Sequence, residues 1–170
     1  GSYLVKAAIG EDIDNETLGG AETHCEISGV TDYKSENDED CLKTIRNIFS
    51  KIGDFEKAGF NRIESKDPKK DKNEIVGILP VNRDKPYNTL EIIDRLVDNS
   101  DFEEYKKGYG ETIICGYARI DGWAIGLIAN QRKLVKSKKG EMQFGGVIYS
   151  DSADKATRFI ANCNQKKIPL

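Results

Sequence analysis

Apolar residues recur with helical spacing in three stretches of this chain, at residues 38–49, 88–97 and 152–165. Residues three or four positions apart lie on one face of a helix, so each stretch predicts a helix whose apolar face packs on a core. These faces consist of Cys41, Leu42, Ile45, Ile48 and Phe49 in the first helix, Leu90, Ile93 and Val97 in the second, and Ala153, Ala156, Phe159, Ile160 and Cys163 in the third.

Polar residues at the start of each run predict where the helices begin. Ser, Asn and Asp side chains accept hydrogen bonds from the free N–H groups of a first turn, and an acidic residue three positions later completes a capping box. The predicted caps are Ser35 with Asp38, Asn88 with Glu91, and Asp151 or Ser150 for the three helices in turn.

A β-hairpin is predicted between the second and third helices. Two apolar runs, at residues 112–120 and 123–129, are separated only by Asp121 and Gly122. A two-residue Asp-Gly loop favours a type I′ turn, because glycine takes a positive φ without steric cost. Tyr117 and Trp123 alternate with small residues on these strands, and we expect them to pack in the core or at an interface.

Residues 54–74 differ from their surroundings. The stretch ESKDPKKDKN at residues 64–73 has little to bury, so residues 54–74 are predicted to form a solvated linker at a domain boundary. After it, the order of strand, strand, helix and a further apolar start predicts an α/β core.

Composition narrows the class of protein. The chain is 38% hydrophobic and 32% charged with a net charge of −3, which is typical of a globular protein with no general attraction to nucleic acid. No apolar run is long enough to cross a membrane. The cysteines form no C-x-x-C pair, and we expect buried, reduced thiols in a cytoplasmic protein.

The chain has one histidine, His24, so a site with several histidine ligands is excluded and no metal is predicted. His24 is either an acid/base group or a structural hydrogen-bonding residue. The second interpretation is favoured, because no serine or cysteine nucleophile is spaced to work with it.

Two features carry candidate chemistry. Gly145 and Gly146 lie between a strand and the last helix, where backbone N–H groups and the helix dipole can stabilise an oxyanion; the alternative is an ordinary glycine turn. Just before them, Lys136, Lys138 and Lys139 belong to a basic cluster that can hold the phosphates of coenzyme A. The alternative is a solvated loop.

Several motifs together resemble one family, the carboxyltransferase (β) subunits of biotin-dependent acyl-CoA carboxylases of the propionyl-CoA and methylcrotonyl-CoA type. The resemblance covers nearly the whole chain, apart from residues 54–74 and the lysine-rich insert. The motifs are LGGAETHCEISGVTD at residues 18–32, LPVNRDKPY at 79–87, IIDRLVD at 92–98, ANQ at 129–131, ATRFI at 156–160 and CNQKKIPL at 163–170.

The resemblance implies a crotonase-like α/β fold of repeated β-β-α layers, with parts of two such domains in this chain. Residues 3–55 would end the N-terminal carboxyltransferase domain, residues 56–74 would be the linker, and residues 75–170 would begin the C-terminal domain. The implied activity is transfer of a carboxyl group from carboxybiotin, carried on a carrier domain, to an acyl-CoA substrate, with no cofactor attached covalently to this chain. The implied partners are a biotin carboxylase and biotin carboxyl carrier subunit and further copies in a homo-oligomer.

The resemblance also implies that the chain is an internal piece of a longer polypeptide. The family's main oxyanion donors would lie outside residues 3–170, so we expect these residues alone to be inactive. The alternative is a crotonase-fold binding or assembly piece without chemistry of its own, because a fold by itself does not fix a function.

Overall fold

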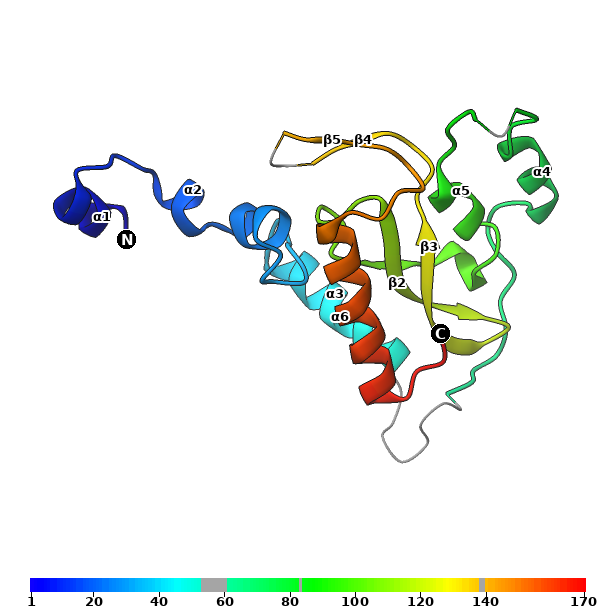
Figure 1. Ribbon diagram of the computed structural model, residues 1–170. Coiled ribbons are helices and arrows are strands. Elements are labelled where there is room, and N and C mark those ends of the chain that lie inside the picture. Colours follow the sequence, from blue (N-terminus) through cyan, green and yellow to red (C-terminus); the bar gives the residue numbers. More distant parts are fainter. Residues whose placement is uncertain (53–60, 83, 138–139) are drawn as a thin grey trace.

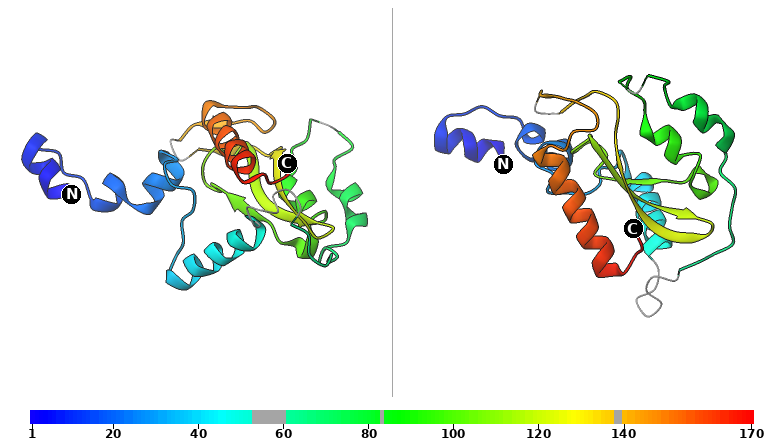
Figure 2. Two further views of the ribbon diagram at one scale, coloured as in Figure 1. Left: turned by 90° about the horizontal axis from the view of Figure 1, so that it is seen from below. Right: turned by 45° about the vertical axis from the view of Figure 1, so that its right-hand side comes forward.

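The computed structural model describes residues 1–52, 61–82, 84–137 and 140–170 (Figure 1). The N-terminal helices α1 (Ser2–Ile9) and α2 (Asn15–Gly19) contribute no buried residue and lie away from the sheet in Figure 1 and in the left view of Figure 2. A short π-helix, η1 (Thr23–Ile27), follows them and buries Cys25. Among the described residues, no helix is long and apolar enough to cross a membrane.

The centre of the fold is an antiparallel sheet in the order β1-β2-β3, formed by Glu103–Tyr105, Ile113–Ile120 and Trp123–Asn130. β2 and β3 form the predicted hairpin, in which Ile120 pairs with Trp123. Asp121 and Gly122 have φ angles of 50° and 78°, the positive values that a type I′ turn requires at both positions. The hairpin prediction is confirmed.

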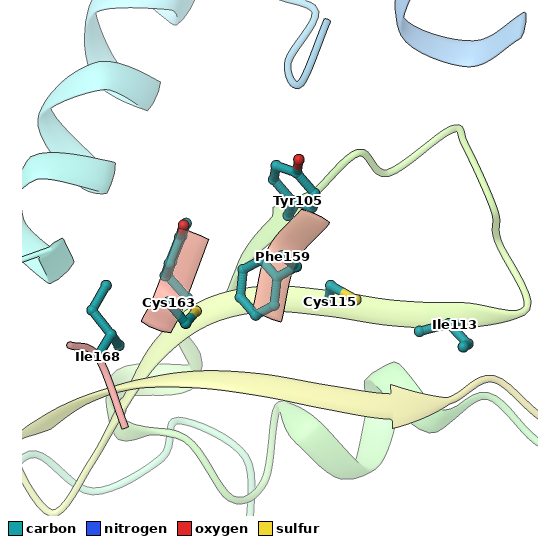
Figure 3. Close-up of a cluster of buried hydrophobic side chains, with 7 residues drawn as sticks. Tyr105, Ile113, Cys115, Phe159, Cys163 and Ile168 are labelled. Carbon is teal, nitrogen blue, oxygen red and sulfur yellow. The ribbon is translucent and has the colours of Figure 1, made fainter. Parts of the chain in front are cut away.

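Side chains of β2 point alternately to the two faces of the sheet, and apolar residues lie on both. Both faces are therefore covered by helices. Ile113, Cys115 and Tyr117 pack with Phe159 and Cys163 of α6 (Ser150–Lys166). Tyr105 and Ile168 complete this buried cluster (Figure 3). The alternate residues of β2 form a second cluster with the segment that contains α5 (Thr89–Ile93). Its buried members are Ile93, Val97, Ile114 and Ala118.

The last predicted helix is confirmed as α6, but its cap is not the predicted residue. Tyr149 is the N-cap, and its N–H donates to the Ser152 hydroxyl, 2.8 Å away. Asp151 and Ser150 already lie inside the helix. The error arises because the reciprocal bond from position N3 stabilises a start one residue earlier than the polar side chains indicate.

The second helix is shorter than predicted. Asn88 caps it by accepting from the Leu90 N–H at 3.3 Å, as expected. α5 ends at Ile93, and turns rather than a helix continue to Val97. The 3-10 turn η4 (Asp98–Ser100) follows, with Asn99 at a φ of 55°. Ile93 and Val97 are nevertheless both buried.

The first predicted helix forms as α3 (Asp38–Ile52), but two details were wrong. Its N-terminal cap is Asn37, whose side chain accepts from the Asp40 N–H at 2.9 Å, in place of Ser35. Its apolar face is also largely uncovered: Leu42, Ile45 and Phe49 are 49%, 44% and 73% exposed, and Cys41 is exposed rather than buried.

Polar contacts explain the rotation of α3. Asn47 donates to the Glu103 carboxylate at 2.5 Å. The buried Lys51 ammonium donates to Asn47 at 2.8 Å and pairs with Asp101 at 3.1 Å. These bonds turn the Asn47–Lys51 side of the helix to the sheet, because a buried ammonium must keep its partners. Only Ile52, at the end of the helix, packs against the main cluster.

Residues 61–63 run along the hairpin tip, and residues 54–60 of the predicted linker lie outside the described residues. The Ala124 N–H donates to the Asn61 carbonyl at 3.0 Å, and the Ile63 N–H donates to the Gly122 carbonyl at 3.1 Å. Further on come η3 (Lys72–Glu74) and α4 (Ile75–Ile78). The division into two partial domains stays a prediction.

Trp123 and Tyr117 behave differently. Tyr117 is in the core, as predicted. Trp123 is 36% exposed, with the Arg62 guanidinium 5.4 Å from its ring centroid. Its ring is therefore partly covered by a cation–π contact instead of lying in the core.

Candidate functional site

The glycine turn predicted as an oxyanion loop joins a small two-stranded ribbon to α6. The ribbon pairs β4 (Val135–Lys136) with β5 (Met142–Gln143). Gly145 and Gly146 form the turn that follows, and α6 begins four residues after it. The turn therefore lies before the positive end of a 17-residue helix.

Packing against Arg132 explains why this turn needs glycine. A Cβ atom at Gly145 would lie 2.4 Å from the Arg132 carbonyl carbon. Gly146 has a φ of 82°, which only glycine adopts readily, and a Cβ there would meet the Arg132 guanidinium. The two glycines are thus required by the protein's own backbone, whether or not a ligand approaches.

The hydrogen bonds of the turn separate the two candidate donors. The Gly146 N–H donates to the Gln131 carbonyl at 2.8 Å, so it is not available to an oxyanion in this structure. For the Gly145 N–H, the described part of the chain contains no acceptor. The turn therefore offers one candidate donor in this conformation, where the sequence indicated two.

Gln131 holds this region together, a role that sequence reasoning missed. Its side-chain carbonyl accepts from the N–H groups of Thr89 at 3.0 Å and Arg132 at 2.9 Å. Its amide nitrogen donates to the Asn88 side chain at 2.9 Å. Gln131 is buried, and its bonds tie the start of α5 to the end of β3 and to the glycine turn. The motif ANQ at residues 129–131 marked Gln131 as part of the family resemblance, but it did not indicate which residues Gln131 bonds.

The predicted phosphate-binding lysines are only partly described. Lys136 lies on β4 with its side chain exposed, while Lys138 and Lys139 lie outside the described residues. An exposed lysine on the ribbon that precedes the glycine turn can act as a point charge for a phosphate, but Lys136 also fits a solvated surface.

His24 is exposed, on the π-helix η1. Its backbone carbonyl accepts from the Thr31 N–H at 3.3 Å. Across the described ranges, no group of three or more His, Cys, Asp and Glu residues is arranged to hold a metal ion.

Two lysines next to β1 are buried, Lys106 and Lys155, and sequence reasoning missed both. The Lys106 ammonium donates to the carbonyls of Gly29 and Thr31 and pairs with Asp32, which fastens the segment after η1 to the sheet. The Lys155 side chain, in the second turn of α6, is fully buried. Alternating apolar positions give no signal for a lysine in a core, because such a residue depends on a distant partner.

The partner of Lys155 is Glu104 on β1, whose carboxylate oxygen lies 4.0 Å from the ammonium nitrogen. The Lys155 ammonium has no hydrogen-bond acceptor in the part of the chain that the structure describes. Burial lowers the pKa of Lys155 and raises the pKa of Glu104, because desolvation penalises both charged forms. Glu104 also lines a cavity of about 500 Å³ beside the sheet.

Comparison with known proteins gives one consistent family. The carboxyl transferase domain matches residues 1–170. The chain is 39% identical over 170 residues to the mitochondrial methylcrotonoyl-CoA carboxylase beta chain of Dictyostelium discoideum, covering all of this chain and 26% of that protein. It is 38% identical to the biotin-dependent 3-methylcrotonyl-coenzyme A carboxylase beta1 subunit of Mycobacterium tuberculosis, covering all of this chain and 30% of that subunit.

Solved structures agree. The transcarboxylase 12S hexamer, crystallised with methylmalonyl-coenzyme A and methylmalonic acid, superposes with a TM-score of 0.85 at 28% identity and covers all of this chain. The match spans 31% of the transcarboxylase chain, so these residues correspond to less than a third of that relative. The predicted crotonase-like α/β fold is confirmed by such neighbours. The chain belongs to the carboxyl transferase domain family.

Proposed function

We propose that the polypeptide carrying these residues transfers a carboxyl group from carboxybiotin to an acyl-CoA. One observation supports this most strongly: similarity to the beta subunits of acyl-CoA carboxylases extends over the whole chain at 38–39% identity. The fold agrees with it, because the neighbour with a TM-score of 0.85 was crystallised with an acyl-CoA substrate. Biotin would supply the activated carboxyl group, and the chain would supply binding and hydrogen-bond donors.

The part of the reaction assigned to this chain is stabilisation of an oxyanion at the glycine turn. The Gly145 N–H is the proposed donor, since the Gly146 N–H already donates to Gln131. Gln131 would position this turn through its bonds to Asn88, Thr89 and Arg132. A donor that is fixed before the reaction costs no reorganisation when negative charge develops.

The lysine-rich insert is proposed to contact the substrate's phosphates. Lys136 is the described member of that group and is exposed on β4. A Lys136→Gln variant should raise the KM for the acyl-CoA and leave kcat unchanged, because a phosphate contact stabilises substrate and transition state equally. Lys43→Gln, an exposed lysine on α3, is the matched control and should change neither.

The partners and location follow from the same relatives. We propose a biotin carboxylase and biotin carboxyl carrier as partners, because the relatives are named biotin-dependent carboxylases. A homo-oligomer is proposed because the transcarboxylase 12S neighbour is a hexamer. A cytoplasmic location is supported by four free cysteines, although some relatives are mitochondrial.

A second candidate is an assembly role without chemistry. It is favoured by the exposed apolar face of α3, which lacks the cover that a core helix has.

The two proposals are separated by the reverse reaction, which needs no partner subunit. The polypeptide is incubated with free biotin and either methylmalonyl-CoA or methylglutaconyl-CoA, and loss of the thioester's carboxyl group is followed by mass spectrometry. Biotin-dependent decarboxylation of either thioester is expected. A folded protein that decarboxylates neither would favour the assembly role.

A further inference from the structure

A second cavity lies at the opposite end of the hairpin from the glycine turn, between the end of α3, residues 63–66, η4 and the hairpin tip. Its volume is about 260 Å³, several times the space that one water molecule occupies in the liquid (about 30 Å³). Its charged lining residues are Lys51, Glu64, Lys66, Asp98, Asp101 and Arg119.

Arg119 is the unusual member of this lining, because it is a buried cation that is bonded, among the described residues, only to neutral groups. Arg119 lies on β2 and is 9% exposed. Its guanidinium donates to the Gly122 carbonyl at 2.9 Å, to the Asn61 carbonyl at 3.4 Å and to the Ser50 carbonyl. A guanidinium has five N–H donors, so two of them have no acceptor among the described residues.

Two of the three carboxylates in the lining, Asp98 and Asp101, are already engaged with other donors, and the third, Glu64, is exposed. One oxygen of Asp98 accepts from the Asp121 N–H at 2.9 Å and the other from the Gly122 N–H at 2.7 Å. Asp101 pairs with the buried Lys51 at 3.1 Å. Asp98 therefore stabilises the Arg119 charge only through space, and burial still lowers the Arg119 pKa.

An oxyanion in the cavity would accept hydrogen bonds from the two remaining N–H groups of Arg119 and compensate its charge. A carboxylate or phosphate oxygen can accept two N–H groups of one guanidinium and neutralise its charge, which is the pairing that arginine favours. Lys66 is exposed on the same wall and adds a second positive charge. The third lysine or arginine of the lining, Lys51, is satisfied by Asn47 and Asp101.

We propose that this cavity binds a small oxyanion, a phosphate or a carboxylate, held by Arg119 and assisted by Lys66. The site uses none of the residues assigned above to carboxyl transfer. The proposal can therefore be tested independently of that activity.

Trp123 gives a direct readout, because it is the single tryptophan of the chain and follows Gly122, whose carbonyl accepts from Arg119. The protein is titrated with sodium phosphate and, separately, with sodium acetate, at an ionic strength held constant with sodium chloride. A saturable change in Trp123 fluorescence is expected for at least one of them. The anion that binds more tightly identifies the class of ligand.

Variants locate the binding. Lys66→Gln should weaken it about threefold, the size of an exposed ion pair. Arg119→Lys should weaken it more than about tenfold, because lysine cannot reproduce the bidentate fork. Lys70→Gln is the matched control, since Lys70 is another exposed lysine of the same segment but pairs with Asp94 outside the cavity.

Two results would overturn the proposal: no saturable response to either anion beyond that to chloride, or equal affinity in wild type and Lys66→Gln. The second comparison does not depend on Arg119→Lys folding correctly. Circular dichroism of each variant establishes that the comparison is between folded proteins.

Discussion

The buried pair of Lys155 and Glu104 predicts an unequal response to removal of its two members. In Glu104→Gln, the Lys155 ammonium stays fully buried and loses the carboxylate with which it forms an ion pair at 4.0 Å. Breaking a buried pair in this way costs about 3–5 kcal/mol. The cost has a ceiling, because the lysine can lose its proton instead, which at pH 7 costs about 4.6 kcal/mol from an ordinary pKa of about 10.4.

Removing the lysine should cost less. In Lys155→Met the buried charge disappears and the side-chain volume is kept, while Glu104 stays 14% exposed on the wall of a cavity of about 500 Å³ where water can reach it. We expect a loss of about 1–2 kcal/mol, the cost of weakened polar contacts. The double variant should be more stable than Glu104→Gln alone, since it leaves no buried charge.

The sign of the pH dependence adds a check. The lowered pKa of Lys155 means that the unfolded chain binds more protons than the native one in the window below the ordinary lysine pKa, so stability rises with pH there. The raised pKa of Glu104 acts oppositely: its contribution falls as pH rises from the ordinary glutamate pKa through the raised one. Both slopes should vanish in the double variant.

Urea unfolding followed by circular dichroism at pH 7 measures these differences. Equal losses in the two single variants, or a loss below about 1 kcal/mol for Glu104→Gln, would show that Lys155 is not a buried charge.

Three further predictions follow from the core, the thiols and α3. Phe159→Ala should lower the free energy of unfolding by about 3–5 kcal/mol, because Phe159 is fully buried between Tyr105 and Tyr117; a loss below about 1 kcal/mol in urea unfolding would mean that α6 does not pack as described. At pH 8 a thiol reagent should modify the exposed Cys41 first and leave Cys115 and Cys163 unreacted until the protein unfolds. Burial raises the pKa values of Cys115 and Cys163 to about 11 and about 12, so equal reaction rates at all three cysteines would contradict the prediction. Phe49→Ser should reduce concentration-dependent association in light scattering without reducing stability, since Phe49 is 73% exposed on the apolar face of α3; unchanged association would exclude this face as the cause.

Local signals predicted local structure. The Asp121-Gly122 turn and the apolar face of α6 were found because short-range geometry determines them: a positive φ in the first case and a helical repeat in the second. The end of α5 at Ile93 was missed because the apolar positions of the following turns keep the same spacing as a helix.

Sequence reasoning missed features that depend on bonds between residues far apart in the sequence. The orientation of α3 depends on Asn47 and Glu103, which are 56 residues apart, and no periodicity reveals that bond. A turn at Gly145 and Gly146 could be predicted from the sequence. Which of the two N–H groups lacks an acceptor depends on the bond from Gly146 to Gln131, and that bond exists only in the folded chain. The same holds for Lys155, whose burial depends on a carboxylate from another element.

Forward carboxyl transfer tests the central proposal most directly. Carboxybiotin labelled with ¹⁴C in its carboxyl group is incubated with propionyl-CoA or methylcrotonyl-CoA and the polypeptide that carries these residues, and the label in the thioester is counted after separation. We predict transfer of the label to at least one thioester at a rate proportional to protein concentration. Release of the label as carbon dioxide alone, with none in either thioester from a folded protein, would contradict the assignment of carboxyl transfer.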